Sequence, residues 1–436
     1  MPTTNVHRRT LLAAVALGLA GCADLGGDDG EEEPEPDDER SDDESDDEEE
    51  DVDTEESETD QEDEVESGGE DAPLIDFRDL EQWELMAGEL MPDREHYVTG
   101  ELSANLNVDS GTEWARLERQ GLGLDMTGSM PNVVCTIEAP DSMDQAIDVL
   151  LEDTGGNRMR LRARIRDTAE DAPFRSYDLG INDWNEEGSV DRTAIDSLRI
   201  QSQFNGGESG RVWVDSIDLQ PLPETPLIMI QWDDGFESQY TEALPIQEDY
   251  DIPSNTFINT VNVGSNGRLT LDQLGELQDA GWEVSSHMMR HDSLLDLGPE
   301  EQEVQIRSAQ EWLVGNGFET GADYFAYTYG EYDRSGYELV TEYHSLAMIG
   351  GEPSYGMPTN RGHVGRSGER TFEEARAYVD TLVEWGGIGA LFWHRIPDET
   401  PHNEFESIMN YIDGRRDDGE LEVITLSQLD ELMGED

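Results

Sequence analysis

Five side chains in the second half of the sequence have the types and spacing needed to hold a metal ion and to move protons. Asp233 and Asp234 stand together after an apolar run, His287 and His291 form an i, i+4 pair, and His394 follows another apolar run. Two neutral imidazoles and one carboxylate can bind a divalent metal and leave one coordination position open for water. The set therefore predicts a catalytic metal site made of both histidines and one of the acids.

The elements around these residues indicate how they are positioned. The apolar segment 226–232 leads directly to Asp233, and the strand-like segment 282–286 leads to His287. Apolar runs and helical segments alternate from residue 225 to residue 436, which predicts a parallel α/β domain. Because such domains place active sites at the carboxyl ends of their strands, the acids and histidines are expected to meet at one edge of the sheet.

Residues 225–436 resemble the polysaccharide deacetylase family, the NodB-homology domain of carbohydrate esterase family four. The first family motif, usually T-F-D-D-G, stands as Q-W-D-D-G at 231–235, and H-[ST]-x-x-H stands as H-M-M-R-H at 287–291. The resemblance implies a distorted (β/α) barrel with Asp233 as the general base. It also implies that Asp234, His287 and His291 are the metal ligands.

The third motif departs from its frequent form, R-x-P-Y-G. The segment A-Y-T-Y-G at 326–330 keeps the final pair but has Ala326 in place of the arginine and Thr328 in place of the proline. The resemblance implies that the main-chain N–H near Tyr329 stabilises an oxyanion, which requires no particular side chain. Since the usual arginine is missing, Arg361 or Arg366 would have to orient Asp233. The fourth motif has no identified counterpart.

The segment L-F-W-H-R-I at 391–396 resembles the last family motif and implies that His394 is the general acid. The remaining histidines of this region, His344, His363 and His402, are interpreted as surface residues or as neighbours of the site. The implied function is metal-dependent removal of N-acetyl groups from an extracellular polysaccharide. Zinc is the expected metal, and cobalt, nickel or manganese would also suit the ligands.

Two other functions are compatible with the same residues. The first is an O-acetyl esterase or another C–N hydrolase on the same scaffold, because a fold does not determine its substrate. The second is a surface glycan-binding lipoprotein whose catalytic domain has decayed, as the altered third motif suggests. Retention of both acids and of three histidines at separate positions argues against decay.

The middle region, 73–222, has short runs of alternating polarity such as 158–165, with turn residues between them. This pattern is typical of a β-sandwich or jelly roll. The segment 210–219 resembles the last strand of carbohydrate-binding jelly-roll modules. Tyr177, Trp184 and the arginines of 158–164 could form a sugar platform, or they could serve the core and the surface. Cys135 is interpreted as a core residue.

The N-terminal segment 1–22 combines paired arginines, a short apolar stretch and the sequence L-A-G-C ending at Cys22. It resembles a twin-arginine lipoprotein signal, in which Cys22 would carry the lipid and anchor the protein to the outer face of the cytoplasmic membrane. A plain signal peptide or an uncleaved anchor is the alternative. In the following segment, 23–72, acids account for 30 of the 48 residues from Asp24 to Asp71, which predicts a disordered linker.

The charge composition is extreme throughout the chain. The net charge is -76, all 27 basic residues are arginines, and the part from Ala72 onward still has 73 acids against 24 arginines. Such self-repulsion is tolerated where molar salt reduces the Debye length to about 3 Å, which indicates an extreme halophile. No basic patch is available to hold phosphates, so the composition argues against nucleic-acid binding.

Overall fold

The computed structural model describes residues 75–139, 145–181, 189–204, 208–350, 355–368 and 371–434. The chain divides into two units, Met1–Asp71 and Ala72–Asp436, and every described residue belongs to the second. The predicted signal segment 1–22 with Cys22 and the predicted linker 23–72 lie outside the described residues. Within the described stretches, no helix has the length and apolar character that crossing a bilayer requires.

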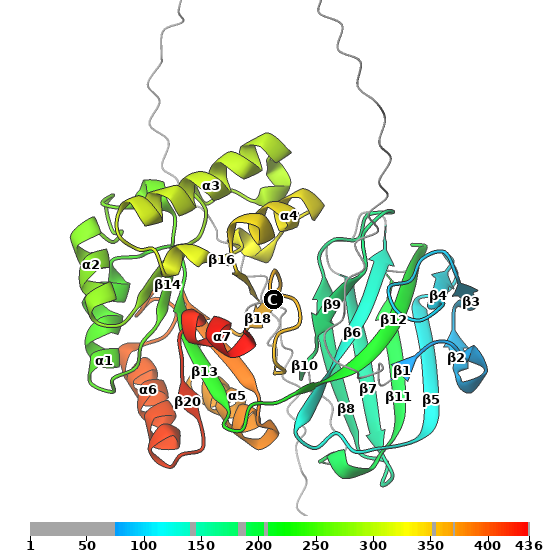
Figure 1. Ribbon diagram of the computed structural model, residues 1–436. Helices are drawn as coiled ribbons and strands as arrows, with labels where there is room; N and C mark the ends of the chain where they lie inside the picture. Colours follow the sequence, from blue (N-terminus) through cyan, green and yellow to red (C-terminus); the bar gives the residue numbers. More distant parts are fainter. Residues whose placement is uncertain are drawn as a thin grey trace, which may run out of the picture. The chain divides into compact units, whose positions relative to one another are not determined.

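Two six-stranded antiparallel sheets form the region 75–221 (Figure 1). The first sheet has the order β3-β4-β12-β6-β9 with β1 beside β12, and the second has the order β10-β8-β7-β11-β5-β2. The strands are β1 (Ile75–Asp76), β2 (Glu84–Ala87), β3 (Glu89–Asp93), β4 (Ser103–Val108), β5 (Trp114–Leu124), β6 (Ser129–Glu138), β7 (Gln145–Asp153), β8 (Arg158–Ile165), β9 (Arg175–Asp178), β10 (Gly180–Ile181), β11 (Ile195–Gln203) and β12 (Gly210–Pro221). The region is strand-rich as predicted, and its assignment as a sandwich or jelly roll stays a prediction.

Strand β8 alternates arginines with apolar residues, and this alternation explains both its strand conformation and the contacts of its arginines. Apolar residues of β8 are buried in alternation with the arginines, as period-two packing requires. Arg162 pairs with Asp148 at 2.6 Å and Arg158 with Glu152 at 2.5 Å, in both cases across the β7–β8 register. Tyr177 is only 1% exposed, so its ring cannot form the sugar platform considered from the sequence. Trp184, its proposed partner, lies outside the described residues.

A parallel sheet forms the C-terminal region and confirms the predicted β/α arrangement. Its order is β18-β17-β16-β15-β14-β13-β19, with β20 beside β13, and one parallel bridge between Ser367 and Leu391 connects the β18 end to β19. The strands β13 to β19 therefore follow one another around a ring, which a single bridge closes. Their bounds are β13 (Leu227–Trp232), β14 (Asn255–Ile258), β15 (Glu283–Ser286), β16 (Tyr324–Ala326), β17 (Leu346–Gly350), β18 (Val364–Arg366), β19 (Ile388–Trp393) and β20 (Glu422–Val423).

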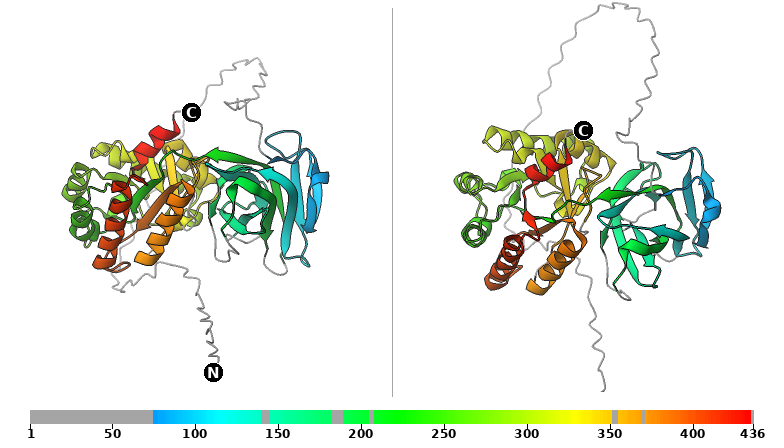
Figure 2. Two further views of the ribbon diagram at one scale, coloured as in Figure 1. Left: turned by 90° about the horizontal axis from the view of Figure 1, so that it is seen from below. Right: turned by 60° about the horizontal axis from the view of Figure 1, so that its bottom comes forward.

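Helices surround these strands (Figure 2). They are α1 (Leu244–Glu248), α2 (Leu271–Asp279), α3 (Pro299–Gly315), α4 (Arg334–Tyr343), α5 (Phe372–Trp385), α6 (His402–Asp417) and α7 (Leu426–Met433). Thr270 and Thr371 begin α2 and α5 with complete capping boxes, which satisfy main-chain N–H groups at the first turn.

The short helix α7 covers the amino ends of two strands. The main-chain N–H of Leu426 donates to the side chain of Asn255, and the Ser427 hydroxyl donates to Glu283. Asn255 and Glu283 are the first residues of β14 and β15. Because α7 lies at this end, the loops that can carry a site are those at the carboxyl ends of the strands.

Candidate active site

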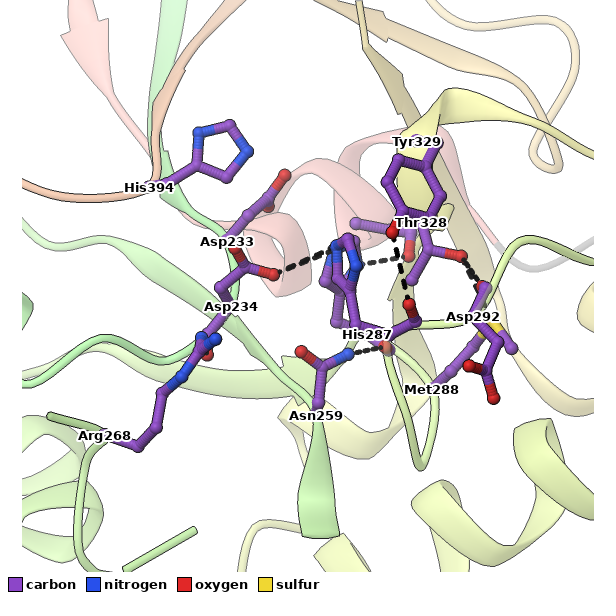
Figure 3. A network of polar contacts seen from close by, with 12 residues as sticks. Asp233, Asp234, Asn259, Arg268, His287, Met288, Asp292, Thr328, Tyr329 and His394 are labelled. Carbon is purple, nitrogen blue, oxygen red and sulfur yellow. Dashed lines mark hydrogen bonds and ion pairs between the residues drawn. The ribbon is translucent and has the colours of Figure 1, made fainter. Parts of the chain in front are cut away.

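Loops at the carboxyl ends of three parallel strands bring the predicted site residues together (Figure 3). Asp233 and Asp234 follow β13, His287 and His291 follow β15, and His394 follows β19. The Asp234 carboxylate lies 3.7 Å from Nε2 of His287 and 3.2 Å from Nε2 of His291. All five residues singled out from the sequence and the family resemblance are therefore part of one site.

The main chain of these loops is unusual. Among the described residues four non-glycine residues have a positive φ, and three of them, Asp234, Met288 and Tyr329, belong to the site loops. Gly235 follows at φ 61°, and a Cβ there would lie 2.9 Å from Ile258. Left-handed conformations of this kind cost roughly 1–2 kcal/mol for residues other than glycine. Their concentration here shows that the loops are held by their surroundings in the shape that aims the ligands.

The three predicted ligands suit a divalent metal. One ligand atom from each of Asp234, His287 and His291 lies within 4.8 Å of the others. Oδ1 of Asp234 is buried and receives no hydrogen bond from any described residue, although a buried carboxylate oxygen normally has a partner. A cation bound between the imidazoles would supply the missing partner, so the residues fit the metal that the sequence predicted.

The environment of His287 prepares it for a metal. Its Nδ1 donates to the carbonyl of Ala326 at 2.7 Å, which leaves Nε2 as the lone-pair nitrogen on the side of Asp234. Burial is the main reason that its pKa falls to about 4, against the opposing effect of Asp233. The imidazole is therefore neutral near pH 7, as ligation requires. His291 keeps 22% of its side chain exposed, so solvent and substrate can approach from its side.

Asp233 is held by Arg366, one of the two arginines that the sequence offered for this role. The guanidinium donates to Oδ1 at 2.8 Å and to Oδ2 at 2.6 Å, and both side chains are almost completely buried. Burial alone would raise the pKa of Asp233, but the charges of Arg366, His287 and His394 lower it to about 2. Arg361, the other candidate, pairs with Asp430 instead.

His394 has a carboxylate partner of its own. Its Nδ1 donates to Oε1 of Glu399 at 2.8 Å, and its main-chain N–H donates to the other oxygen of the same carboxylate. Burial opposes protonation, but the hydrogen bond that His394 donates to Glu399 and the charges of Asp233 and Asp234 raise the pKa of His394 above its ordinary value. The ring is thus oriented with Nε2 available and is biased toward the protonated form.

Gln239 connects the two loops that carry the proposed base and acid. It lies in the π-helical turn η3 (Gln239–Ala243) and is fully buried. Its Nε2 donates to the carbonyls of Asp233 and His394 at 2.6 and 3.0 Å, and its Oε1 accepts from the Thr256 hydroxyl. One side chain therefore fixes the separation of two catalytic candidates.

The altered third motif contacts the histidine loop. The Thr328 hydroxyl donates to the carbonyl of Asp292 and contacts the sulfur of Met288, so the two replaced motif residues touch each other. Tyr329 packs edge-on against His291 with ring centroids 4.5 Å apart, and its hydroxyl donates to the carbonyl of His291. The side chain of Tyr329 therefore lies against His291, one of the proposed metal ligands.

A cleft of about 480 Å³ opens beside His291 and Tyr329. Three acids, Asp292, Asp296 and Glu331, line the rest of the cleft together with Ser293 and Leu297. The cleft is continuous with the proposed metal ligands and is large enough to accept a sugar ring.

The other histidines and Cys135 lie away from this chemistry. His344 is buried with its Nδ1 donating to the carbonyl of Ala322, and His363 is buried against the Tyr332 hydroxyl. His402 forms an ion pair with Glu242. The exposure of His402 agrees with its interpretation as a surface residue, whereas His344 and His363 are buried and not on the surface. Cys135 is buried in β6, as predicted.

Sequence reasoning missed three residues that position the site: Gln239, Glu399 and Asn259. The side chain of Asn259 donates to the carbonyl of His287 and so supports the ligand loop. None of the three belongs to a motif quoted above. The only signal for Asn259 was its position directly after β14, at the same edge of the sheet.

Comparisons with known proteins agree with the geometry over part of the chain. Residues 222–345 match the family model of polysaccharide deacetylase. This segment includes Asp233, Asp234, His287, His291 and Tyr329, and it ends before Arg366 and His394.

Individual relatives are distant. A putative polysaccharide deacetylase from Bacillus subtilis, YxkH, is 25% identical over 125 residues, which cover 27% of this chain and 44% of that protein. The deacetylase PplD of Streptococcus pyogenes, solved with acetate, is 21% identical over 32% of this chain and 62% of its own, with a TM-score of 0.31. A family 4 acetyl xylan esterase of Clostridium thermocellum, solved with cobalt, is 16% identical over 48% and 92%, with a TM-score of 0.37. The chain thus spans less than two thirds of the length of YxkH and of PplD.

Proposed function

We propose, from the family match of residues 222–345 and the geometry of the site, that this protein is a metal-dependent hydrolase that removes N-acetyl groups from an extracellular polysaccharide. The observation that carries the proposal is the buried, unpartnered Oδ1 of Asp234 between two imidazoles, next to the ionised Asp233. A structural metal site would have no need of a neighbouring base and acid.

The metal would be held by Asp234, His287 and His291, and when bound it would supply Lewis acidity toward water and the acetyl carbonyl. In our proposal it is zinc, and cobalt, nickel or manganese would fit the same ligands. The neutral His287 offers its Nε2 lone pair to such an ion without first losing a proton.

Asp233 is the proposed acceptor of the water's proton. Its low pKa makes it a weak base, so the water must be acidified for the transfer to occur. Arg366 occupies both of its oxygens in the plane of the carboxylate and so determines the direction in which a further proton can be accepted. This arrangement makes the base and the metal mutually dependent.

His394 is the proposed donor of a proton to the departing nitrogen. Glu399 holds Nδ1, so Nε2 is the nitrogen that can reach the substrate. The raised pKa keeps a larger share of the imidazole protonated near neutral pH, as a general acid requires. The main-chain N–H of Tyr329 is proposed to stabilise the oxyanion by resemblance to the family. The products would be acetate and a free amino sugar.

The location and accessory parts belong to the same proposal and rest on the sequence. Segment 1–22 would direct twin-arginine export, Cys22 would carry the lipid, and 23–72 would tether the folded part to the outer face of the cytoplasmic membrane of an extreme halophile. The sheets of 73–222 would form a β-sandwich that either binds glycan or serves as a spacer.

The function is tested by acetate release in high salt from N-acetylglucosamine oligomers and from O-acetylated xylan. We expect release from the oligomers and none from Asp233→Asn protein. Release from xylan alone would favour the esterase alternative. Binding of the oligomers without release from either substrate would favour a decayed, glycan-binding protein.

A further inference from the structure

Two guanidinium groups share one aromatic ring at the edge of the site. Arg268 lies with its guanidinium carbon 3.8 Å from the ring centroid of Phe236, and Arg395 lies 4.7 Å from the same centroid. We call these three residues the arginine rim. Phe236 follows Asp233, Asp234 and Gly235 directly, and Arg395 follows His394. Two of the three rim residues, Phe236 and Arg395, therefore lie next to the proposed ligand, base and acid in the chain.

Of the two rim cations, only Arg395 pairs with a carboxylate among the described residues. With 103 acids against 27 arginines, most guanidinium groups have carboxylates nearby. Arg268 forms no ion pair with any carboxylate of the described residues, and its hydrogen bond goes to the main-chain carbonyl of Asp234. Arg395 is about half exposed and lies 3.4 Å from the exposed Asp398. The two guanidinium groups lie against the same ring, so their like charges oppose each other.

A structural role explains only part of this arrangement. The bond to Asp234 uses one donor of Arg268 and supports the left-handed main chain of the ligand. It gives no reason for a second cation on the same ring. Packing alone would be served by an apolar side chain without the cost of bringing like charges together.

We propose that the arginine rim binds an anionic group, a carboxylate or a sulfate, on the sugar next to the N-acetylated residue. This inference rests on the proposed function and names its substrate class as an acidic N-acetylated glycan. Guanidinium groups present paired in-plane N–H donors that match oxyanions, and aromatic stacking holds the guanidinium plane in place.

The two sides of the site differ in charge, which gives the glycan a direction. Figure 3 shows Arg268 and Tyr329 on opposite sides of Asp234 and His287. The cleft beside Tyr329 is lined by Asp292, Asp296 and Glu331 and would repel an anionic sugar. An alternating acidic polymer would therefore bind in one register, with its charge at the rim and an uncharged sugar in the cleft.

The net charge of the protein does not prevent such binding in molar salt. A Debye length of about 3 Å screens the distant acids, so groups in direct contact decide which charges are accepted. The relevant comparison is consequently between glycans that differ only at the sugar that would touch the rim.

The test measures kcat/KM for three N-acetylglucosamine oligosaccharides of equal length whose neighbouring sugar is neutral, carboxylated or sulfated. Arg395→Gln is the main variant because Arg395 is exposed and its loss should leave folding intact. Arg307→Gln removes the same charge from a partly exposed side chain of α3 that pairs with Glu303, and it is the matched control. We expect the anionic-to-neutral ratio of kcat/KM to fall at least tenfold in Arg395→Gln and to stay at the wild-type value in Arg307→Gln. The arm with the larger fall identifies the anion.

Equal ratios in the wild type, Arg395→Gln and Arg307→Gln would overturn the proposal. A second readout keeps this failure distinct from failure of the hydrolase function. Calorimetric titration of metal-free protein with the carboxylated and sulfated oligosaccharides should show binding that weakens at least tenfold in Arg395→Gln and in Arg268→Gln. Unchanged binding in both variants would contradict the rim even if no acetate is released from any substrate.

Discussion

Arg366 at the end of β18 holds both carboxylate oxygens of Asp233 after the end of β13, with hydrogen bonds of 2.8 and 2.6 Å. The guanidinium also lies over the ring of Phe392, 4.2 Å from its centroid. Because the planar guanidinium is held by both the carboxylate and the Phe392 ring, it fixes the orientation of the Asp233 side chain as well as balancing its charge. Asp233, the proposed base, is thus positioned by a strand that follows the altered third motif in the chain.

Arg366→Lys should separate orientation from charge. Lysine keeps the positive charge but cannot form the two parallel hydrogen bonds, so the Asp233 carboxylate loses its fixed orientation. Misplacement of a catalytic group costs about 10²-fold in rate. We expect kcat for acetate release to fall by about that factor while the metal content per chain stays at the wild-type level. Arg361→Lys, which affects the pair with Asp430, is the matched control. An equal loss in both variants would contradict the assignment of Arg366.

Glu399→Gln should move the alkaline side of the pH profile. The hydrogen bond and charge of Glu399 raise the pKa of His394, and the proposed acid is active when protonated, so activity declines as pH rises through that pKa. Without the charge of Glu399 the pKa falls, and the decline should begin at lower pH. The measurement is kcat against pH for both proteins.

The acidic side of the same profile serves as the internal control for Glu399→Gln. It would depend on Asp233 and on the proposed metal ligands, which this substitution leaves in place. An alkaline limb that stays where it is in the wild type would show that His394 is not the group titrating there.

Gly235→Ala should destabilise the folded state for two separable reasons. Gly235 has φ 61°, and an added Cβ would lie 2.9 Å from Ile258. The conformation costs roughly 1–2 kcal/mol, and crowding of a packed site adds about 1–3 kcal/mol. Gly281→Ala, at φ 88° with no neighbouring atom within 4 Å, carries only the first cost. Urea unfolding should therefore show a larger loss for Gly235→Ala, and equal losses would argue against a tightly packed ligand loop.

The sequence predicted the parts of the site that depend on residue type and on position along a strand. Asp234, His287 and His291 were recognisable because metal ligands belong to few residue types and because these residues stand in or after the segments that end two predicted strands, within motifs resembling those of a known family. The parallel arrangement followed from alternating apolar and helical segments. For Arg366 the sequence left two candidates, since cations are scarce in this chain, and only tertiary structure distinguishes it from Arg361.

The residues that orient the site could not be predicted in the same way. Glu399 is one of 103 acids, and nothing in its local sequence sets it apart from the others. Gln239 acts through carbonyl groups of two loops that are distant in the chain, and such contacts depend on how the ring of strands closes. Tyr177, by contrast, was considered as a surface platform because aromatic residues can stack on sugars, yet its burial follows from the inward face of β9.

The central claim is that Asp234, His287 and His291 hold the metal on which hydrolysis depends. The most direct measurement follows acetate release and metal content together while the chelated protein is titrated with zinc, for the wild type, Asp234→Ala and the exposed control Asp417→Asn. We predict that activity in the wild type and in Asp417→Asn disappears on chelation and returns fully at one metal per chain, while Asp234→Ala recovers less than about 1% at the same zinc concentration. Undiminished acetate release from metal-free wild type, or wild-type activity in Asp234→Ala, would contradict the account.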